Sequence, residues 1–127
     1  MRLLLDTHAV LWALDAPQRL GKSGRPLIED PANEILISPV TPWELAIKVN
    51  SGKMPLHVLV TDFHGVIQRQ NFTAIPLEPA HAIRSGLLPW HHRDPFDRLL
   101  AAQALELGVS IISMDKVFDR YGLTRIW

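Results

Sequence analysis

Cysteine is absent from this 127-residue sequence, which excludes disulfide bonds, thiolate metal ligands and cysteine nucleophiles. Charge of one sign is not in excess either. Thirteen Lys and Arg balance thirteen Asp and Glu, so any nucleic-acid contact must come from a local basic patch. The apolar run at the N-terminus, Leu3 to Leu5, is too short for a signal peptide or a membrane span. We therefore expect a cytoplasmic protein with no membrane contact.

Apolar residues are plentiful, at 47% of the chain, which is enough for a sizeable core. The sequence has no internal repeat, low-complexity tract or linker, so we expect a single domain over residues 1–127. Apolar runs typical of buried strands alternate with stretches of helical period. The expected strands are 2–5, 34–38, 72–77, 109–114 and 123–127, and the expected helices are 9–14, 26–30, 41–53, 59–67, 79–85, 95–107 and 116–121. This alternation predicts an α/β fold with a central parallel sheet covered on both faces.

The stretch from His92 to Leu100 predicts a loop that becomes a helix. Pro95 suits the first helical position, which makes Asp94 the N-cap and puts Asp97 at the capping-box position. Apolar residues then recur at helical spacing along one face. Two carboxylates therefore stand at the start of a helix that packs into the core.

A second helix start is predicted at Thr41-Pro42-Trp43-Glu44, which has the form of a capping box with proline at the first helical position. Trp43 and Ile47 are then expected to face inward. Trp90 follows a Gly/Pro-marked loop, so we expect it to be exposed and regard it as a candidate for stacking on a base.

Four acidic residues are expected at one edge of the sheet. Asp6 and Asp115 end strands, while Glu44 and Asp97 stand near helix starts, and the functional crevice of such folds lies at the carboxyl ends of the strands. Each acid could instead be an isolated helix cap. If the four are close, two charges 4 Å apart repel by roughly 4 kcal/mol at an effective dielectric constant of 20, which a raised pKa or a bound cation would offset. Carboxylate oxygens suit Mg²⁺ or Mn²⁺, and such a site could activate water against a phosphodiester.

Several segments, in order along nearly the whole chain, resemble the PIN-domain ribonucleases, and more narrowly the VapC toxins of VapBC toxin–antitoxin pairs. The segments that carry the resemblance are Leu4-Leu5-Asp6-Thr7-His8, Ile37-Ser38 with Trp43-Glu44-Leu45, Gly52-Lys53, His92-Arg93-Asp94-Pro95-Phe96-Asp97-Arg98, Ala101-Ala102-Gln103-Ala104 and Ile112-Ser113-Met114-Asp115. No single segment is specific, but the combination is. The resemblance implies a PIN-like three-layer α/β/α fold and Mg²⁺- or Mn²⁺-dependent endonuclease action on RNA.

The resemblance also implies roles for individual residues. The acidic metal-binding and catalytic set would be Asp6, Glu44, Asp97 and Asp115. Three further residues are possible auxiliaries: Asp94, Ser113 and Arg98. Asp94 is either a ligand or only a helix cap, and Ser113 would orient a carboxylate or a water. Arg98 is a candidate from its chemistry and not from the resemblance: it would contact phosphate, which arginine matches in a bidentate way, or lie in a solvated loop, or form an internal ion pair with an acid.

Partners follow from the same resemblance. Toxins of this family are typically held inactive by a VapB-like antitoxin, form homodimers or toxin–antitoxin hetero-oligomers, and reach operator DNA only through the antitoxin.

Two other classes of protein, the aspartyl phosphatases and the signal-receiver domains, fit this sequence poorly. An aspartyl phosphatase needs a second acid where His8 stands, and a signal receiver needs paired acids after its first strand. A catalytically silent PIN-like module held by a partner protein remains the alternative.

Overall fold

The five strands form one parallel sheet in the computed structural model, which describes residues 1–127. They are β1 (Arg2–Leu5), β2 (Glu34–Ile37), β3 (Thr73–Ala74), β4 (Ser110–Ile112) and β5 (Arg125–Ile126), in the order β3-β2-β1-β4-β5. The central strand β1 pairs with β2 on one side and with β4 on the other. Because all strands run the same way, their carboxyl ends meet at one edge.

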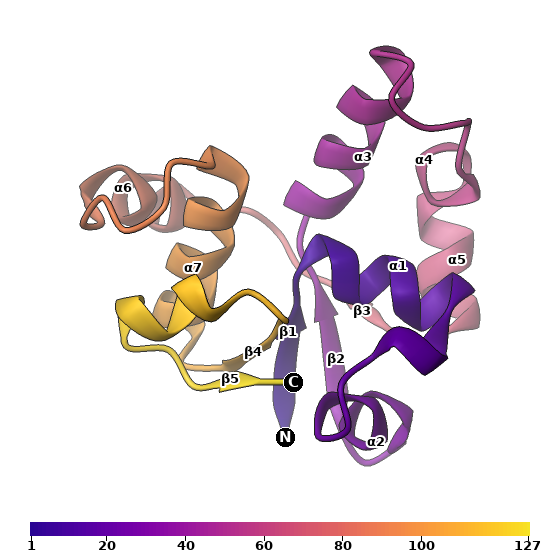
Figure 1. Ribbon diagram of the computed structural model, residues 1–127, viewed down its shortest axis with the longest axis horizontal. Coiled ribbons are helices and arrows are strands. Elements are labelled where there is room, and N and C mark those ends of the chain that lie inside the picture. Colours follow the sequence, from indigo (N-terminus) through magenta and orange to yellow (C-terminus); the bar gives the residue numbers. More distant parts are fainter.

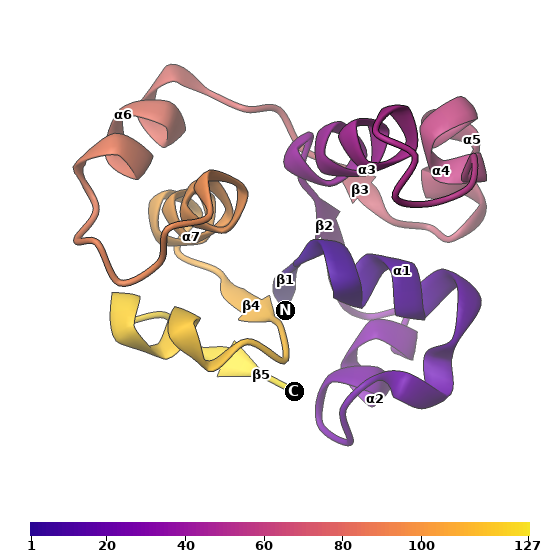
Figure 2. The ribbon, with the colours of Figure 1, turned by 45° about the horizontal axis from the view of Figure 1, so that its top comes forward.

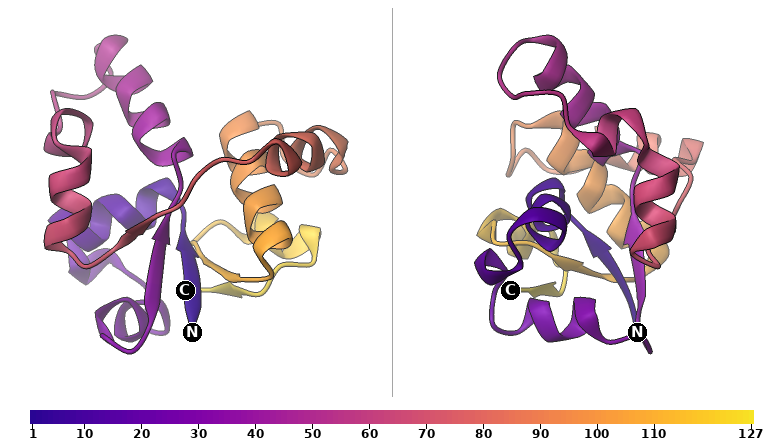
Figure 3. Two further views of the ribbon diagram at one scale, coloured as in Figure 1. Left: turned by 180° about the vertical axis from the view of Figure 1, so that it is seen from behind. Right: turned by 90° about the vertical axis from the view of Figure 1, so that its right-hand side faces the viewer.

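Helices cover both faces of this sheet (Figures 1 and 3). They are α1 (Thr7–Asp15), α2 (Gly24–Glu29), α3 (Val40–Asn50), α4 (Val58–Thr61), α5 (Phe63–Arg69), α6 (Pro79–Leu87) and α7 (Pro95–Leu107), with the short 3₁₀ helices η1 (Pro17–Arg19) and η2 (Lys116–Tyr121). Viewed as in Figure 1, α1 to α5 lie on one side of β1, and α6, α7 and η2 lie on the other. None of these helices is long and apolar enough to cross a membrane.

The apolar side chains of the central strands supply two cores. Successive strand residues point to opposite faces, so Leu3 and Leu5 pack with α1, α3, α4 and α5, whereas Leu4 packs with α7 and η2. All three leucines are fully buried. A run of consecutive apolar residues is what a strand covered on both faces requires, and the predicted three-layer α/β/α architecture with a parallel sheet is confirmed.

The predicted helix over 95–107 is confirmed together with its N-cap and its first proline. Asp94 caps it, Pro95 is the first helical residue, and Gly108 ends it at a φ of 64°, in the left-handed region that glycine adopts without strain. The predicted helix over 59–67 is instead two helices, α4 and α5, which meet at Asp62 with φ −139° and ψ 51°.

The prediction for α3 is wrong in its start and in its buried face. The helix begins at Val40, where the Ser38 hydroxyl accepts the Val40 N–H at 3.0 Å, and no Thr41–Glu44 capping box forms. Its buried stripe includes Thr41 and Leu45, while Trp43 is 53% exposed and Ile47 44% exposed. A shift of two residues corresponds to about 200° around a helix, so Trp43 and Ile47 lie opposite the stripe that packs.

Candidate metal centre

All four predicted acids lie at the carboxyl edge of the sheet. Asp6 follows β1 and caps α1, and Asp115 follows β4 and caps η2. Asp97 stands in the first turn of α7, and Glu44 lies one turn into α3. The starts of α1 and α3 lie together beyond β1 and β2, and α7 lies across from them (Figure 2). Four separate elements thus bring one carboxylate each to the same region.

Asp6 is the most deeply buried of the four, with 6% of its surface exposed. Its carboxylate accepts the Ala9 N–H at 2.8 Å and the Ser113 hydroxyl. Burial raises the pKa of Asp6 above its ordinary value of 3.8, although these hydrogen bonds act in the opposite direction. The Ser113 oxygen also accepts the Asp115 N–H at 3.0 Å, so this hydroxyl links the ends of β1 and β4.

His92 lies between two of the acids, a position that the sequence did not predict. Its Nε2 is 2.8 Å from the Asp97 carboxylate and 3.4 Å from that of Asp115. Its Nδ1 accepts the Asp94 N–H at 3.1 Å, and a neutral imidazole carries its proton on the other nitrogen. Nε2, the nitrogen that lies near the two carboxylates, is therefore the one that carries the ring proton. The sequence signal for this hydrogen bond was the two-residue spacing from His92 to Asp94, because a side chain can accept the backbone N–H of a residue two positions further along the chain.

The pKa of the Asp97 carboxyl is also raised, by burial and by its charged neighbours. Burial, then repulsion by Asp94 and more weakly by Asp6 and Glu44, raises the pKa of Asp97 to about 7, against the opposing effect of His92. Asp97 does not close the predicted capping box, because the Asp94 N–H that it would accept is bonded to His92 instead. The acids are thus near enough to oppose one another's ionisation.

Glu44 is held to the cluster from the next helix. The Thr7 hydroxyl donates to one of its carboxylate oxygens at 2.7 Å, and Lys48 Nζ lies 3.6 Å from the other. Thr7 directly follows Asp6 in the chain, so the first residue of α1 fixes a carboxylate that comes from α3. This contact joins residues 37 positions apart.

Of the possible auxiliaries, Asp94 acts as the predicted helix cap, because its carboxylate accepts the Phe96 N–H at 2.9 Å. The alternative of an ion pair between Arg98 and an acid is wrong. Arg98 is 4% exposed, and its guanidinium donates to backbone carbonyls in the last turn of α6 and in the loop that follows it. These are the carbonyls of Ser85 and Pro89 at 2.9 Å and of Leu88 at 3.0 Å. Its cation neutralises the C-terminal end of α6 rather than the acidic cluster.

The donor set fits a hard divalent cation. The four acids offer only oxygen, the element that Mg²⁺ and Mn²⁺ prefer. His92, Asp97 and Asp115 form a group whose side-chain N and O atoms lie within 4.8 Å of one another. The two carboxylates are the candidate ligands in this group, because one ring nitrogen of His92 already carries a proton and the other accepts the Asp94 N–H. The Asp97 side chain is 22% exposed and that of Asp115 is 46% exposed, so an ion can reach them from solvent. A cation here would offset the repulsion that raises the pKa of Asp97.

The largest surface pocket lies elsewhere. It has a volume of about 530 Å³ and lies against α6 and α7, where Ile83, Leu87 and Leu88 line it beside the Arg84–Glu106 ion pair. None of the four acids borders it. Pocket size alone would therefore have pointed away from the acidic cluster.

The parallel sheet in the order β3-β2-β1-β4-β5 places this protein in the α/β class. The four acids at the carboxyl edge of the sheet give it a candidate metal centre. A PIN domain family model matches residues 3–123, and the chain belongs to the PIN domain family. The resemblance to PIN domains and VapC toxins is confirmed.

The similar proteins differ in their sequence identity to this chain and in how much of their own length the match covers. Ribonuclease VapC22 of Mycobacterium tuberculosis is 28% identical over 115 residues, which are 90% of this chain and 87% of that protein. Methionyl-tRNA formyltransferase of Coxiella burnetii is 30% identical over 135 residues, but the match covers only 41% of that protein. VapBC2 from Rickettsia felis, bound to a DNA fragment from their promoter, has a TM-score of 0.71 at 18% identity, with 99% of this chain and 98% of that chain covered. This last likeness shows the shared fold.

Proposed function

We propose that this protein is an Mg²⁺- or Mn²⁺-dependent endoribonuclease, formed by one PIN-like domain over residues 1–127, and the toxin of a toxin–antitoxin pair. The observation that supports it most is the convergence of Asp6, Glu44, Asp97 and Asp115 with a raised pKa at Asp97. Membership of the PIN family and the similarity to a ribonuclease support the same proposed function.

Individual residues of the site would have separate roles in metal binding and in positioning the carboxylates. Asp6, Asp97 and Asp115 would hold the cation, with Glu44 beside them. A bound divalent ion supplies an acidified water and neutralises charge on the phosphoryl oxygens. Ser113 keeps the Asp6 carboxylate in place through its hydrogen bond, as Thr7 does for Glu44. Hydrolysis adds the water oxygen to phosphorus, breaks one P–O bond, and leaves a proton on the departing oxygen.

We further propose that the protein works with partners in the cytoplasm. The Rickettsia felis structure is of a VapBC complex on promoter DNA, which supports a VapB-like antitoxin as partner, with operator DNA reached through it. A homodimer or a toxin–antitoxin hetero-oligomer is the assembly that we propose.

The experiment that tests the activity is cleavage of a mixed RNA pool by purified protein with Mg²⁺, Mn²⁺ or EDTA. Asp97→Asn, purified identically, controls for a contaminating nuclease. Asp62→Asn is the matched control, because Asp62 is 52% exposed and pairs with Arg69 away from the cluster. We expect metal-dependent cutting by the wild type and Asp62→Asn only. Equal cutting by Asp97→Asn would refute the metal site, and no cutting by any of the folded proteins would favour the silent binding module.

A further inference from the structure

Two exposed tryptophans are attached to the first turn of α7, on either side of Asp97. The Trp43 ring packs edge-on against Phe96, with ring centroids 4.8 Å apart and an interplanar angle of 81°. The guanidinium of Arg98 lies 4.0 Å from the centroid of the Trp90 ring. Phe96 and Arg98 directly precede and follow Asp97, so they leave the helix about 100° to either side of it. In the chain, Trp43 also directly precedes Glu44, and Trp90 lies two residues before His92, whose Nε2 is 2.8 Å from the Asp97 carboxylate. Both rings are therefore attached to residues of the acidic cluster or to their neighbours.

Both rings are open to solvent although their supports are fixed. Trp43 is 53% exposed and Trp90 is 79% exposed. Phe96 packs against the core beneath α7, and Arg98 is held by three carbonyl oxygens. A large aromatic surface is costly to leave in water, and rigid supports remove the entropy cost of ordering the rings on binding.

We propose that Trp43 and Trp90 are base-stacking positions that receive unpaired nucleobases on either side of the phosphate held at the acidic cluster. The proposal deepens the proposed function and rests on it. Unpaired bases stack on aromatic side chains with little regard to sequence, because every base has a π face. A phosphate held by a cation at the acidic cluster would bring its neighbouring bases toward the rings.

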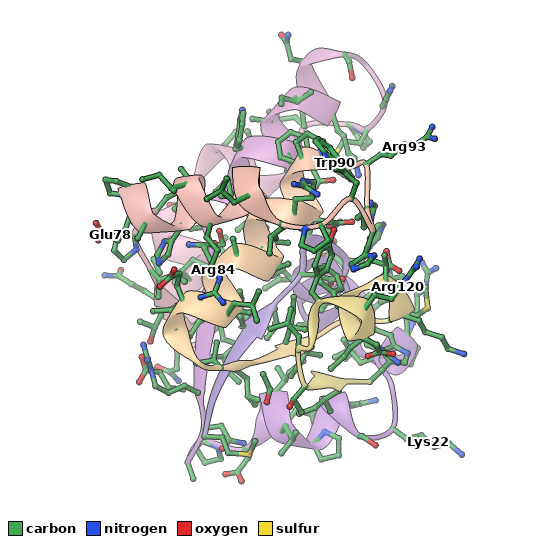
Figure 4. All side chains as sticks on the ribbon, turned by 90° about the vertical axis from the view of Figure 1, so that its left-hand side faces the viewer. Lys22, Glu78, Arg84, Trp90, Arg93 and Arg120 are labelled. Carbon is green, nitrogen blue, oxygen red and sulfur yellow. The ribbon has the colours of Figure 1, made fainter.

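The surrounding charge suits a nucleic acid strand. Arg93 is exposed in the same loop as Trp90, between α6 and α7 (Figure 4). Lys48 lies beside Glu44 with about a third of its side chain exposed. These cations can contact the phosphates that flank the one at the cluster. In a chain with no net charge, such local cations are where attraction to RNA must arise.

The test compares two fluorescein-labelled RNA 12-mers by anisotropy in Mg²⁺, one of mixed sequence and one with every base removed. Asp97→Asn is present in every protein so that cleavage is blocked, and Trp43→Ala, Trp90→Ala and Trp43→Phe are added singly. Ile83→Ala is the matched control, because Ile83 is 64% exposed on α6. We expect each Trp→Ala change to weaken binding of the base-bearing RNA roughly ten- to hundredfold, the range for loss of one stacked base.

The abasic RNA separates stacking from a structural role. We expect its affinity to be unaffected by Trp43→Ala and Trp90→Ala, and Trp43→Phe to keep most of the affinity for the base-bearing RNA. Equal weakening of both RNAs, or of neither, would overturn the proposal. So would a change of oligomeric state in light scattering without a change in base preference, because the rings would then contact protein. Cleavage is measured apart from binding, so failure of the nuclease and failure of stacking are distinguishable.

Discussion

Replacing Asp97 with asparagine should make the metal-free protein more stable at pH 8. In the wild type, burial and the neighbouring carboxylates raise the pKa of Asp97 from 3.8 to about 7. At 1.36 kcal/mol per pH unit, this corresponds to about 4 kcal/mol against the ionised form in the folded state. Asparagine keeps the shape of the side chain, but it carries no charge. Because relaxation around the ion reduces the penalty, we expect a gain of about 2 kcal/mol.

The sign of the pH dependence follows from where the proton is held. Between about pH 4 and pH 7 the folded protein keeps a proton on Asp97 that the unfolded chain has lost, so stability falls as pH rises through that range. The raised pKa of Asp6 acts in the same direction. Asp97→Asn removes the contribution of Asp97 to this slope, and its advantage over the wild type should vanish near pH 4.

Thermal unfolding in EDTA at pH 5 and pH 8 measures the effect, with Asp62→Asn as the control. For a chain of this length about 2 kcal/mol corresponds to a shift of roughly 8 °C. Adding Mn²⁺ should then stabilise the wild type more than the variant, because only the wild type has the full set of ligands. The reasoning is refuted if Asp97→Asn is less stable than the wild type at pH 8 or if its advantage is the same at both pH values.

Two further substitutions test the supports of the site. Ser113→Ala removes the hydroxyl that donates to Asp6, so we expect the pKa of Asp6 to rise further, followed by NMR titration of its carboxyl, and a loss of about 1–3 kcal/mol in urea unfolding; an unchanged pKa would contradict this. Arg98→Ala leaves three carbonyls without their donor. It should cost about 2–4 kcal/mol, and Arg98→Lys should recover only part of it, since lysine lacks the planar fork. Full recovery by lysine would show that charge alone matters there.

Local sequence signals predicted α7 well because they act within a few residues. A cap, a proline at the first helical position, an apolar stripe and a terminal glycine all agree over residues 94–108. The same kind of signal failed for α3, where apolar residues lie on both sides of the helix. Thr41 and Leu45 pack inward, whereas Trp43 and Ile47 do not. Periodicity identifies an apolar stripe, but it does not choose between two of them.

The sequence by itself determined the α/β order, the PIN resemblance and the placement of Asp6, Glu44, Asp97 and Asp115 near the ends of elements. Each follows from short-range patterns or from a motif that survives as a string of letters. Only the tertiary structure decided that His92 lies between Asp97 and Asp115 and that Arg98 binds carbonyls rather than an acid. Those contacts depend on how loops and helices pack, as does the Ser113–Asp6 hydrogen bond across 107 residues. No local pattern encodes such a contact, because its geometry exists only once the sheet has brought both ends together.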